Sequence, residues 1–223
     1  MSGESGVEKK YSRLATLDSL VFNPARDGFG FQNPVGIALT RTGGGSFFRR
    51  LDSFLHGRGL CFGMSAAALL YFAERMAGTS HPPLAELPLT PALLDNLRKR
   101  HLQQFRPRTV FSVIRDWLAS GGGRPEHILG RIQLPGVNPD PHVLCFGPAL
   151  NRKFFYCFAQ AHAVVPYKVE EGRVFVYDPN YPRDRARFVE FWRDGRSVEF
   201  AYGRFRSWEG WGITLVPASM CTR

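Results

Sequence analysis

The sequence predicts an α+β fold in which a helical half is followed by an antiparallel β half. Residues 62–120 are rich in Ala, Leu and other helix-favouring residues, interrupted by Pro- and Gly-containing links. After about residue 130 the chain consists of short segments rich in β-branched and aromatic residues, separated by Gly, Pro, Asn and Asp. Because helices and strands are segregated and do not alternate, the pattern favours α+β over a parallel α/β sheet.

Three helices are expected in the first half. The first, Phe62–Ala77, has a broad apolar face and ends at Gly78, so we expect a buried central helix. Pro91, at a first helical turn, begins a second helix that continues to about Phe105. A third helix spans Thr109–Ser120 and is closed by three consecutive glycines.

Seven strands are expected in the second half. They are Val143–Phe146, Phe154–Phe158, Ala163–Val169, Arg173–Tyr177, Ala186–Trp192, Val198–Tyr202 and Gly212–Val216.

A chain of 223 residues fits one domain, so we expect a single domain at 19–223, with a helical part at about 55–125 and a β part at about 140–217. Residues 1–18 are expected to be a flexible leader.

The composition indicates a protein that does not enter a membrane. Hydrophobic residues make up 44% of the chain and charged residues 22%, the balance of a soluble globular protein. The longest apolar run lies within Ala66–Ala73 and is too short to span a bilayer. Residues 1–20 lack the apolar centre of a secretory signal, so a cytoplasmic location is expected.

The formal net charge of +10 comes from 24 Arg and 5 Lys set against 19 acidic residues. A basic surface can meet nucleic acid, a membrane surface or an acidic substrate. The arginines are spread from Arg13 to Arg223, and no aromatic-and-basic module accompanies them, which argues against a nucleic-acid partner. The group Arg183–Arg187 either borders a cleft for acidic substrates or forms a solvated loop.

The cysteines give no sign of a metal or redox centre. Cys61, Cys145, Cys157 and Cys221 include no CxxC pair, so neither a zinc ribbon nor a thioredoxin-type site is indicated. Without a secretion signal the thiols are expected to be reduced, and each is either buried filler or a reactive group.

A metal site can still be drawn from His142, Cys145, Cys157 and His162. Its spacing crosses strands with opposing faces, so it is disfavoured. We expect no metal and no cofactor.

The segment His56-Gly-Arg-Gly-Leu-Cys61-Phe-Gly-Met-Ser65 delivers one cysteine to the first turn of the expected central helix. Backbone N–H groups at a helix N-terminus stabilise a thiolate and can bind a developing oxyanion. Cys61 is therefore a candidate nucleophile. The alternative is a small buried residue at a helix start.

A second group of candidates lies on an expected hairpin. His162 opens one strand, Glu170-Glu171-Gly172 forms the turn, and Asp178-Pro-Asn180 ends the returning strand. A three-residue loop closed by glycine at its left-handed position sets Val169 opposite Arg173. His162, Asp178 and Asn180 then share one face, with the carboxylate in reach of the imidazole. The alternative is a strand histidine followed by an ordinary turn.

These segments resemble papain-like cysteine peptidases, in particular the bacterial branch related to bacteriocin-processing (double-glycine) peptidases. The resembling segments are Gly59-Leu-Cys61-Phe-Gly-Met-Ser65, Ala161-His162-Ala-Val-Val and Val176-Tyr-Asp178-Pro-Asn180-Tyr-Pro182. The resemblance implies a papain-like fold whose central helix starts at the cysteine. It also implies that Cys61 is the nucleophile, His162 the base and Asp178 the orienting residue, with Asn180 as the competing orienter.

The sequence departs from that family's pattern in the oxyanion hole. Such enzymes place a Gln shortly before the cysteine, where this chain has Leu55 and His56. Gln32, Asn33 or His56 are the candidates to replace it, and a neutral amide is the better chemical match. Trp208 or Trp211 could shield the histidine from solvent.

The function expected from these residues is a thiol hydrolase, a cysteine peptidase or amidase that acts on a peptide or amide substrate through a thioester. An acyltransferase would use the same constellation. The alternative class is a catalytically inert papain-like binding or scaffold protein.

Overall fold

The computed structural model describes residues 20–35, 59–119, 124–148 and 161–221. Helices precede strands along the chain, and the fold is mixed helix and sheet, as the sequence predicts. The expected leader, His56 and the expected strand Phe154–Phe158 lie outside the described residues. The helices are α2 (Pro24–Asp27), α4 (Cys61–Met76), α5 (Pro91–Leu102), α6 (Pro107–Ala119) and α7 (Pro125–Leu129), with 3₁₀ turns η1 (Leu84–Glu86), η2 (Gln103–Phe105), η3 (Ser207–Glu209) and η4 (Ala218–Cys221).

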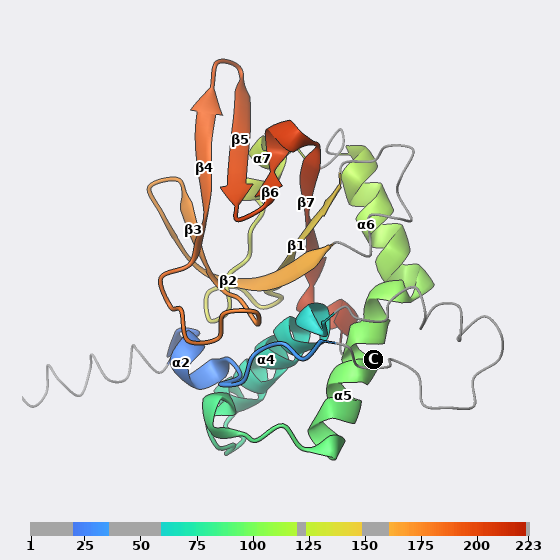
Figure 1. Cartoon of the computed structure of the whole chain (residues 1–223), viewed down its shortest axis with the longest axis vertical. Helices are drawn as coiled ribbons and strands as arrows, with labels where there is room; N and C mark the ends of the chain where they lie inside the picture. The colour runs from blue at the N-terminus through green and yellow to red at the C-terminus, as the bar shows by residue number, and fades with distance from the viewer. Residues whose placement is uncertain (1–19, 36–58, 120–123, 149–160, 222–223) are drawn as a thin grey trace, which may run out of the picture.

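Helix α4 is the central helix that the sequence predicts, and it starts at Cys61. Its residues from Phe62 to Leu69 are all buried, which explains why apolar side chains surround this part of the helix. It lies against α5 on one side and against the sheet on the other (Figure 1). A side chain at Gly63 would come within 2.3 Å of the Leu97 carbonyl oxygen, so glycine allows α5 to pack closely.

The strands form one antiparallel sheet in the order β6-β5-β4-β3-β2-β1-β7. Short β6 also contacts β7, so the two edges approach each other and the sheet nearly closes into a barrel. The strands are β1 (His142–Pro148), β2 (His162–Glu170), β3 (Arg173–Tyr177), β4 (Phe188–Asp194), β5 (Ser197–Tyr202), β6 (Phe205–Arg206) and β7 (Trp211–Pro217).

The sheet separates two apolar cores. On β1, Leu144 and Phe146 face a cluster inside the curved sheet, whereas Val143 and Cys145 face the cluster formed with α4. Ile128 of α7 joins the inner cluster. The near-continuous apolar run of this strand is therefore explained by burial on both faces.

Several expected element boundaries are wrong by a few residues. Strand β4 begins at Phe188 and not at Ala186, because the Ala186 N–H donates to Oδ1 of Asp184 in a turn (3.1 Å). The second helix stops at Leu102 and continues as a 3₁₀ turn to Phe105. The third begins at Pro107, which suits a first helical turn.

The β2–β3 hairpin differs from the expected turn and still reaches the expected register further on. Glu170 pairs with Arg173, so the turn is two residues long, with φ of 44° at Glu171 and 79° at Gly172. The predicted three-residue loop is therefore wrong. A bulge between Pro166 and Lys168 then shifts the pairing by one residue, as is common where a proline cannot donate to the ladder.

Beyond the bulge, Val165 pairs with Tyr177. Extended by one residue, this register sets Val164 opposite Asp178. The predicted alignment of His162 with Asp178 thus results from the bulge and not from the turn.

None of the helices within the described ranges has both the length and the apolar character that crossing a membrane requires.

Candidate active site

Cys61 is the first residue of α4, and its side chain is half-buried. The residue before it, Leu60, is the N-cap and offers no side-chain cap. Instead, the Leu60 N–H donates to Oδ1 of Asn33 at 2.5 Å, so a residue from a distant loop holds the backbone in front of the cysteine. The first N–H groups of an α-helix lack partners within the helix, and Cys61 stands at this end of α4.

His162 is the first residue of β2 and is only 6% exposed. Its Nε2 lies 2.8 Å from Oδ1 of Asp178. The Cys61 side chain lies close enough to the imidazole to help raise the pKa of His162. Because Asp178 occupies Nε2, Nδ1 is the ring nitrogen left for the thiol. The structure thus brings together the three residues that the sequence predicts.

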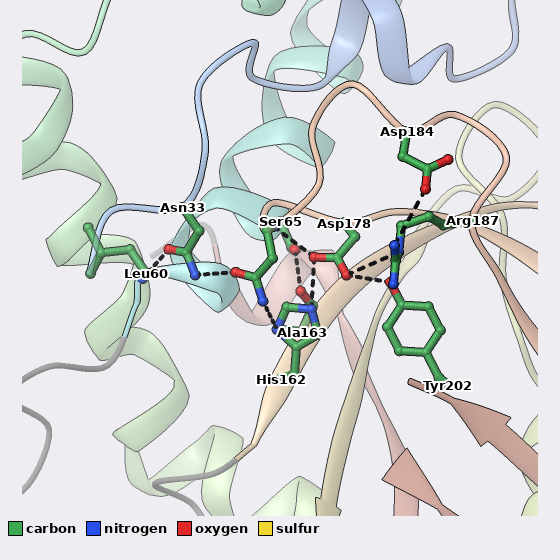
Figure 2. A network of polar contacts seen from close by, with 10 residues as sticks. Asn33, Leu60, Ser65, His162, Ala163, Asp178, Asp184, Arg187 and Tyr202 are labelled. Atoms are coloured by element: carbon green, nitrogen blue, oxygen red, sulfur yellow. Dashed lines mark hydrogen bonds and ion pairs between the residues drawn. The ribbon is translucent and has the colours of Figure 1, made fainter. Parts of the chain in front are cut away.

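Asp178 follows β3 and is almost completely buried, at 1% exposure. Its Oδ1 accepts hydrogen bonds from His162 and from the Asn180 N–H, the latter at 2.8 Å. Its Oδ2 accepts a short hydrogen bond from the Tyr202 hydroxyl, and Arg187 Nε lies 3.9 Å away. Figure 2 shows this network running from Leu60 through Asn33 and His162 to Arg187. A buried carboxylate with this many donors is stabilised in its ionised form.

Burial and hydrogen bonding act in opposite directions on the two central groups. Burial alone would lower the pKa of His162, but its hydrogen bonds to Asp178 and Cys61 and their charges raise that pKa to about 9. Burial would raise the pKa of Asp178, but the hydrogen bonds from His162, Tyr202 and Asn180 hold it below its ordinary value. The geometry therefore favours an imidazolium beside an ionised carboxylate.

Aromatic rings enclose the imidazole on its inner side. The ring of His162 is nearly parallel to those of Phe146, Tyr202 and Phe205, with centroids 6.0–6.5 Å away. The shield expected from Trp208 or Trp211 is thus provided by other residues.

The two tryptophans lie further out. Trp211 packs edge-on against Phe205, and exposed Trp208 pairs with Trp192. In the sequence, the alternation of Phe200 and Tyr202 on one strand was a signal of inward-facing aromatics, but it did not identify the partner of either ring.

The three candidates for the oxyanion hole differ in their burial and in their contacts. Gln32 is exposed, and His56 is outside the described residues. Asn33 is buried, at 8% exposure, and its Nδ2 donates to Oδ1 of Asn180 at 2.8 Å. Nδ2 of Asn180 lies 3.5 Å from Nδ1 of His162. Asn180 is thus the amide in contact with the histidine, and Asn33 contacts Asn180.

Within the group Arg183–Arg187, the residue that contacts the site in the described part of the chain is Arg187. The Arg187 guanidinium lies over the Tyr181 ring at 3.7 Å from its centroid, and its Nε donates to the Tyr202 hydroxyl at 3.1 Å. Sequence reasoning missed Tyr202 and this role of Arg187, because neither belongs to a local motif.

The remaining cysteines have separate surroundings. Burial raises the pKa of Cys145 well above its ordinary value and that of Cys221 to about 12, so both stay protonated at neutral pH. Cys157 lies outside the described residues. Nδ1 of His142 accepts a hydrogen bond from the Gln133 N–H, and in the described part of the chain no three His, Cys, Asp or Glu side chains gather as metal ligands.

No model of a protein family, no curated protein sequence and no solved structure matches this chain.

Proposed function

We propose that this protein is a thiol hydrolase of the papain-like kind, a cysteine peptidase or amidase with Cys61 as nucleophile, His162 as base and acid, and Asp178 as the orienting residue. One observation carries the proposal. His162 binds buried Asp178 through Nε2 and has the Cys61 side chain close enough to raise its pKa, and the cysteine stands at the start of a long helix. Nucleophile, base and orienting group in this order define an activated nucleophile.

In the acylation step, Cys61, His162 and the start of α4 each have a separate role. The Cys61 proton moves to Nδ1 of His162, and the sulfur attacks the carbonyl carbon of the substrate. The negative charge that develops on the carbonyl oxygen is bound by N–H donors at the start of α4. The C–N bond then breaks, Nδ1 returns its proton to the leaving nitrogen, and a thioester remains on Cys61.

Hydrolysis of the thioester runs the same groups in reverse. Nδ1 of His162 removes a proton from water, the hydroxide attacks the thioester carbon, and the proton returns to the Cys61 sulfur as it leaves. Asp178 keeps Nε2 protonated throughout, because an ionised carboxylate can only accept a hydrogen bond. An amine or alcohol in place of water would make the reaction an acyl transfer.

Two further features support the papain-like assignment. A central helix that begins at the cysteine and an antiparallel sheet that carries the histidine and aspartate are what the resemblance implies. Asn33, buried beside the N-terminus of α4, accepts from the Leu60 N–H and donates to the Asn180 amide, so neutral amides lie at this end of the helix.

The test is whether Cys61 forms an acyl-enzyme. The protein is mixed with p-nitrophenyl acetate, nitrophenolate release is followed, and the acetylated residue is identified by mass spectrometry. We expect a burst of nitrophenolate with the acetyl group on Cys61, and no burst in Cys61→Ser. His162→Ala should acylate slowly. Acetylation of exposed lysines only, with no burst, is the result expected of an inert binding or scaffold protein.

A further inference from the structure

We propose that the side-chain amide of Asn180 is the oxyanion donor of this site, and that Asn33 is the positioning residue that aims it. The inference rests on the proposed function and identifies the group that stands in for the glutamine missing before Cys61. It concerns a residue that follows the orienting aspartate and is linked to the helix N-terminus through Asn33.

The orientation of both amides follows from the chemistry of their partners. The Leu60 backbone N–H can only donate, so the atom of Asn33 that lies 2.5 Å from it must be the carbonyl oxygen. Asn33 therefore presents its NH₂ group to Asn180, whose carbonyl oxygen accepts at 2.8 Å. Asn180 is left with its own NH₂ group directed at His162 Nδ1, 3.5 Å away. A flip of either amide would set like groups against each other.

The side chains of Asn33 and Asn180 are held rigidly. The Asn33 N–H donates to the Pro179 carbonyl at 2.8 Å, and the Asn180 N–H donates to Asp178 Oδ1 at the same distance. Asn33 also fills the space beside Gly59, where a Cβ atom would come within 2.0 Å of its Nδ2. A donor fixed on both its backbone and its side chain needs no reorganisation during the reaction.

The proton state of His162 decides what the Asn180 amide binds. Asp178 binds Nε2, so Nδ1 of a neutral ring can accept from the Asn180 NH₂ group 3.5 Å away, whereas Nδ1 of the imidazolium can only donate. When Nδ1 takes the thiol proton it becomes a donor, and it no longer accepts from the amide. The amide N–H is then left without an acceptor on the ring.

The acceptor that appears next is the carbonyl oxygen of the substrate. As the Cys61 sulfur bonds to the carbonyl carbon, the C=O electron pair moves to oxygen, and the Asn180 N–H donates to that oxygen. No atom is gained or lost by Asn180. Once Nδ1 carries the proton, the amide is free to bind the substrate oxygen instead of the ring. A neutral amide is suited to this role, whereas a carboxylate would repel the oxyanion.

The experiment compares two reactions of Cys61. Acetylation by p-nitrophenyl acetate passes through an oxyanion, whereas alkylation by iodoacetamide displaces iodide and forms none. Both rate constants are measured for the wild type, Asn180→Ala, Asn180→Asp and Asn33→Ala. Asn180→Asp keeps the acceptor for Asn33 and removes the donor. Asn96→Ala, which removes an exposed amide on α5, is the matched control.

We expect acetylation to fall by about 100-fold in both Asn180 variants, with alkylation changed much less. Asn33→Ala should lose about tenfold in acetylation, because the donor is present but no longer held. Equal losses in both reactions would overturn the proposal and assign Asn180 a structural role. Unchanged acetylation in the Asn180 variants, with a reactive wild type, would also overturn it. A wild type that forms no acyl-enzyme overturns the proposed function itself.

Discussion

The Tyr202 hydroxyl donates to Oδ2 of Asp178, on the opposite side of the carboxylate from the oxygen that binds His162. Tyr202 comes from β5 and Asp178 from the end of β3, so the curvature of the sheet is what brings them together. Each carboxylate oxygen thus has a buried donor. This arrangement fixes the plane of the carboxylate and with it the orientation of the imidazole.

Removal of the Tyr202 hydroxyl is expected to weaken the fold and the site together. In Tyr202→Phe, Oδ2 of Asp178 loses a buried hydrogen bond to a charged group, which costs about 1–3 kcal/mol. We expect urea unfolding to show this loss and acetylation of Cys61 to slow. Tyr181→Phe is the matched control, because it keeps the ring under Arg187 and removes a hydroxyl from a half-exposed residue. Equal behaviour of the two variants would contradict the role of Tyr202.

Neutralisation of Asp178 is expected to lower the pKa of His162. In the wild type that pKa is raised to about 9, with hydrogen bonding and the charge of Asp178 among the causes. Asp178→Asn keeps the size of the side chain and removes its charge, so the pKa should fall toward its ordinary value of 6.5. NMR titration of ¹³C-labelled histidine measures it directly. A pKa that stays near 9 in the variant would show that Asp178 does not hold the imidazolium.

The same shift predicts how stability depends on pH. His162 has a higher pKa in the folded state than the 6.5 of the unfolded chain, so the folded state binds its proton more tightly. This contribution to stability is complete below pH 6.5 and is lost as pH rises through about 9. We expect the free energy of unfolding to decline between these values in the wild type and to be flatter in Asp178→Asn. Parallel curves would contradict this assignment.

Gly59 is expected to tolerate no side chain. A Cβ atom there would come within 2.0 Å of Asn33 Nδ2, so Gly59→Ala should displace Asn33 from Leu60 and Asn180. Overpacking of this kind costs about 1–3 kcal/mol. The control is Gly130→Ala, where a Cβ atom meets nothing within 4 Å. Thermal unfolding compares the two, and a Gly59→Ala protein as stable as Gly130→Ala would rule out the close contact.

The sequence predicts the fold class and the candidate site because both depend on local patterns. Alanine and leucine at helical spacing identify the central helix, and its glycine-rich approach identifies Cys61. His162 and Asp178 lie on one hairpin, so a short-range register argument links them. The predicted alignment is right although the predicted turn is wrong, because the bulge beside Pro166 offsets the shorter loop.

The contacts that complete the site are long-range and could not be predicted in this way. Asn33 and Asn180 are 147 residues apart in the chain, and Asp178 and Tyr202 meet only once β4 and β5 follow β3 around the sheet. Strand order is set by packing of the whole sheet and leaves no signal at these positions. Asn33 was a candidate for its chemistry, and its partner became known only from the structure.

The most direct test of the central claim is iodoacetamide labelling as a function of pH, followed residue by residue with mass spectrometry. It is carried out on the wild type and on His162→Ala, with Cys145 and Cys221 as internal references. We predict fast labelling of Cys61 below about pH 7, lost or moved to higher pH in His162→Ala. Labelling of Cys61 at the rate of an ordinary thiol, unchanged by His162→Ala, would contradict the account.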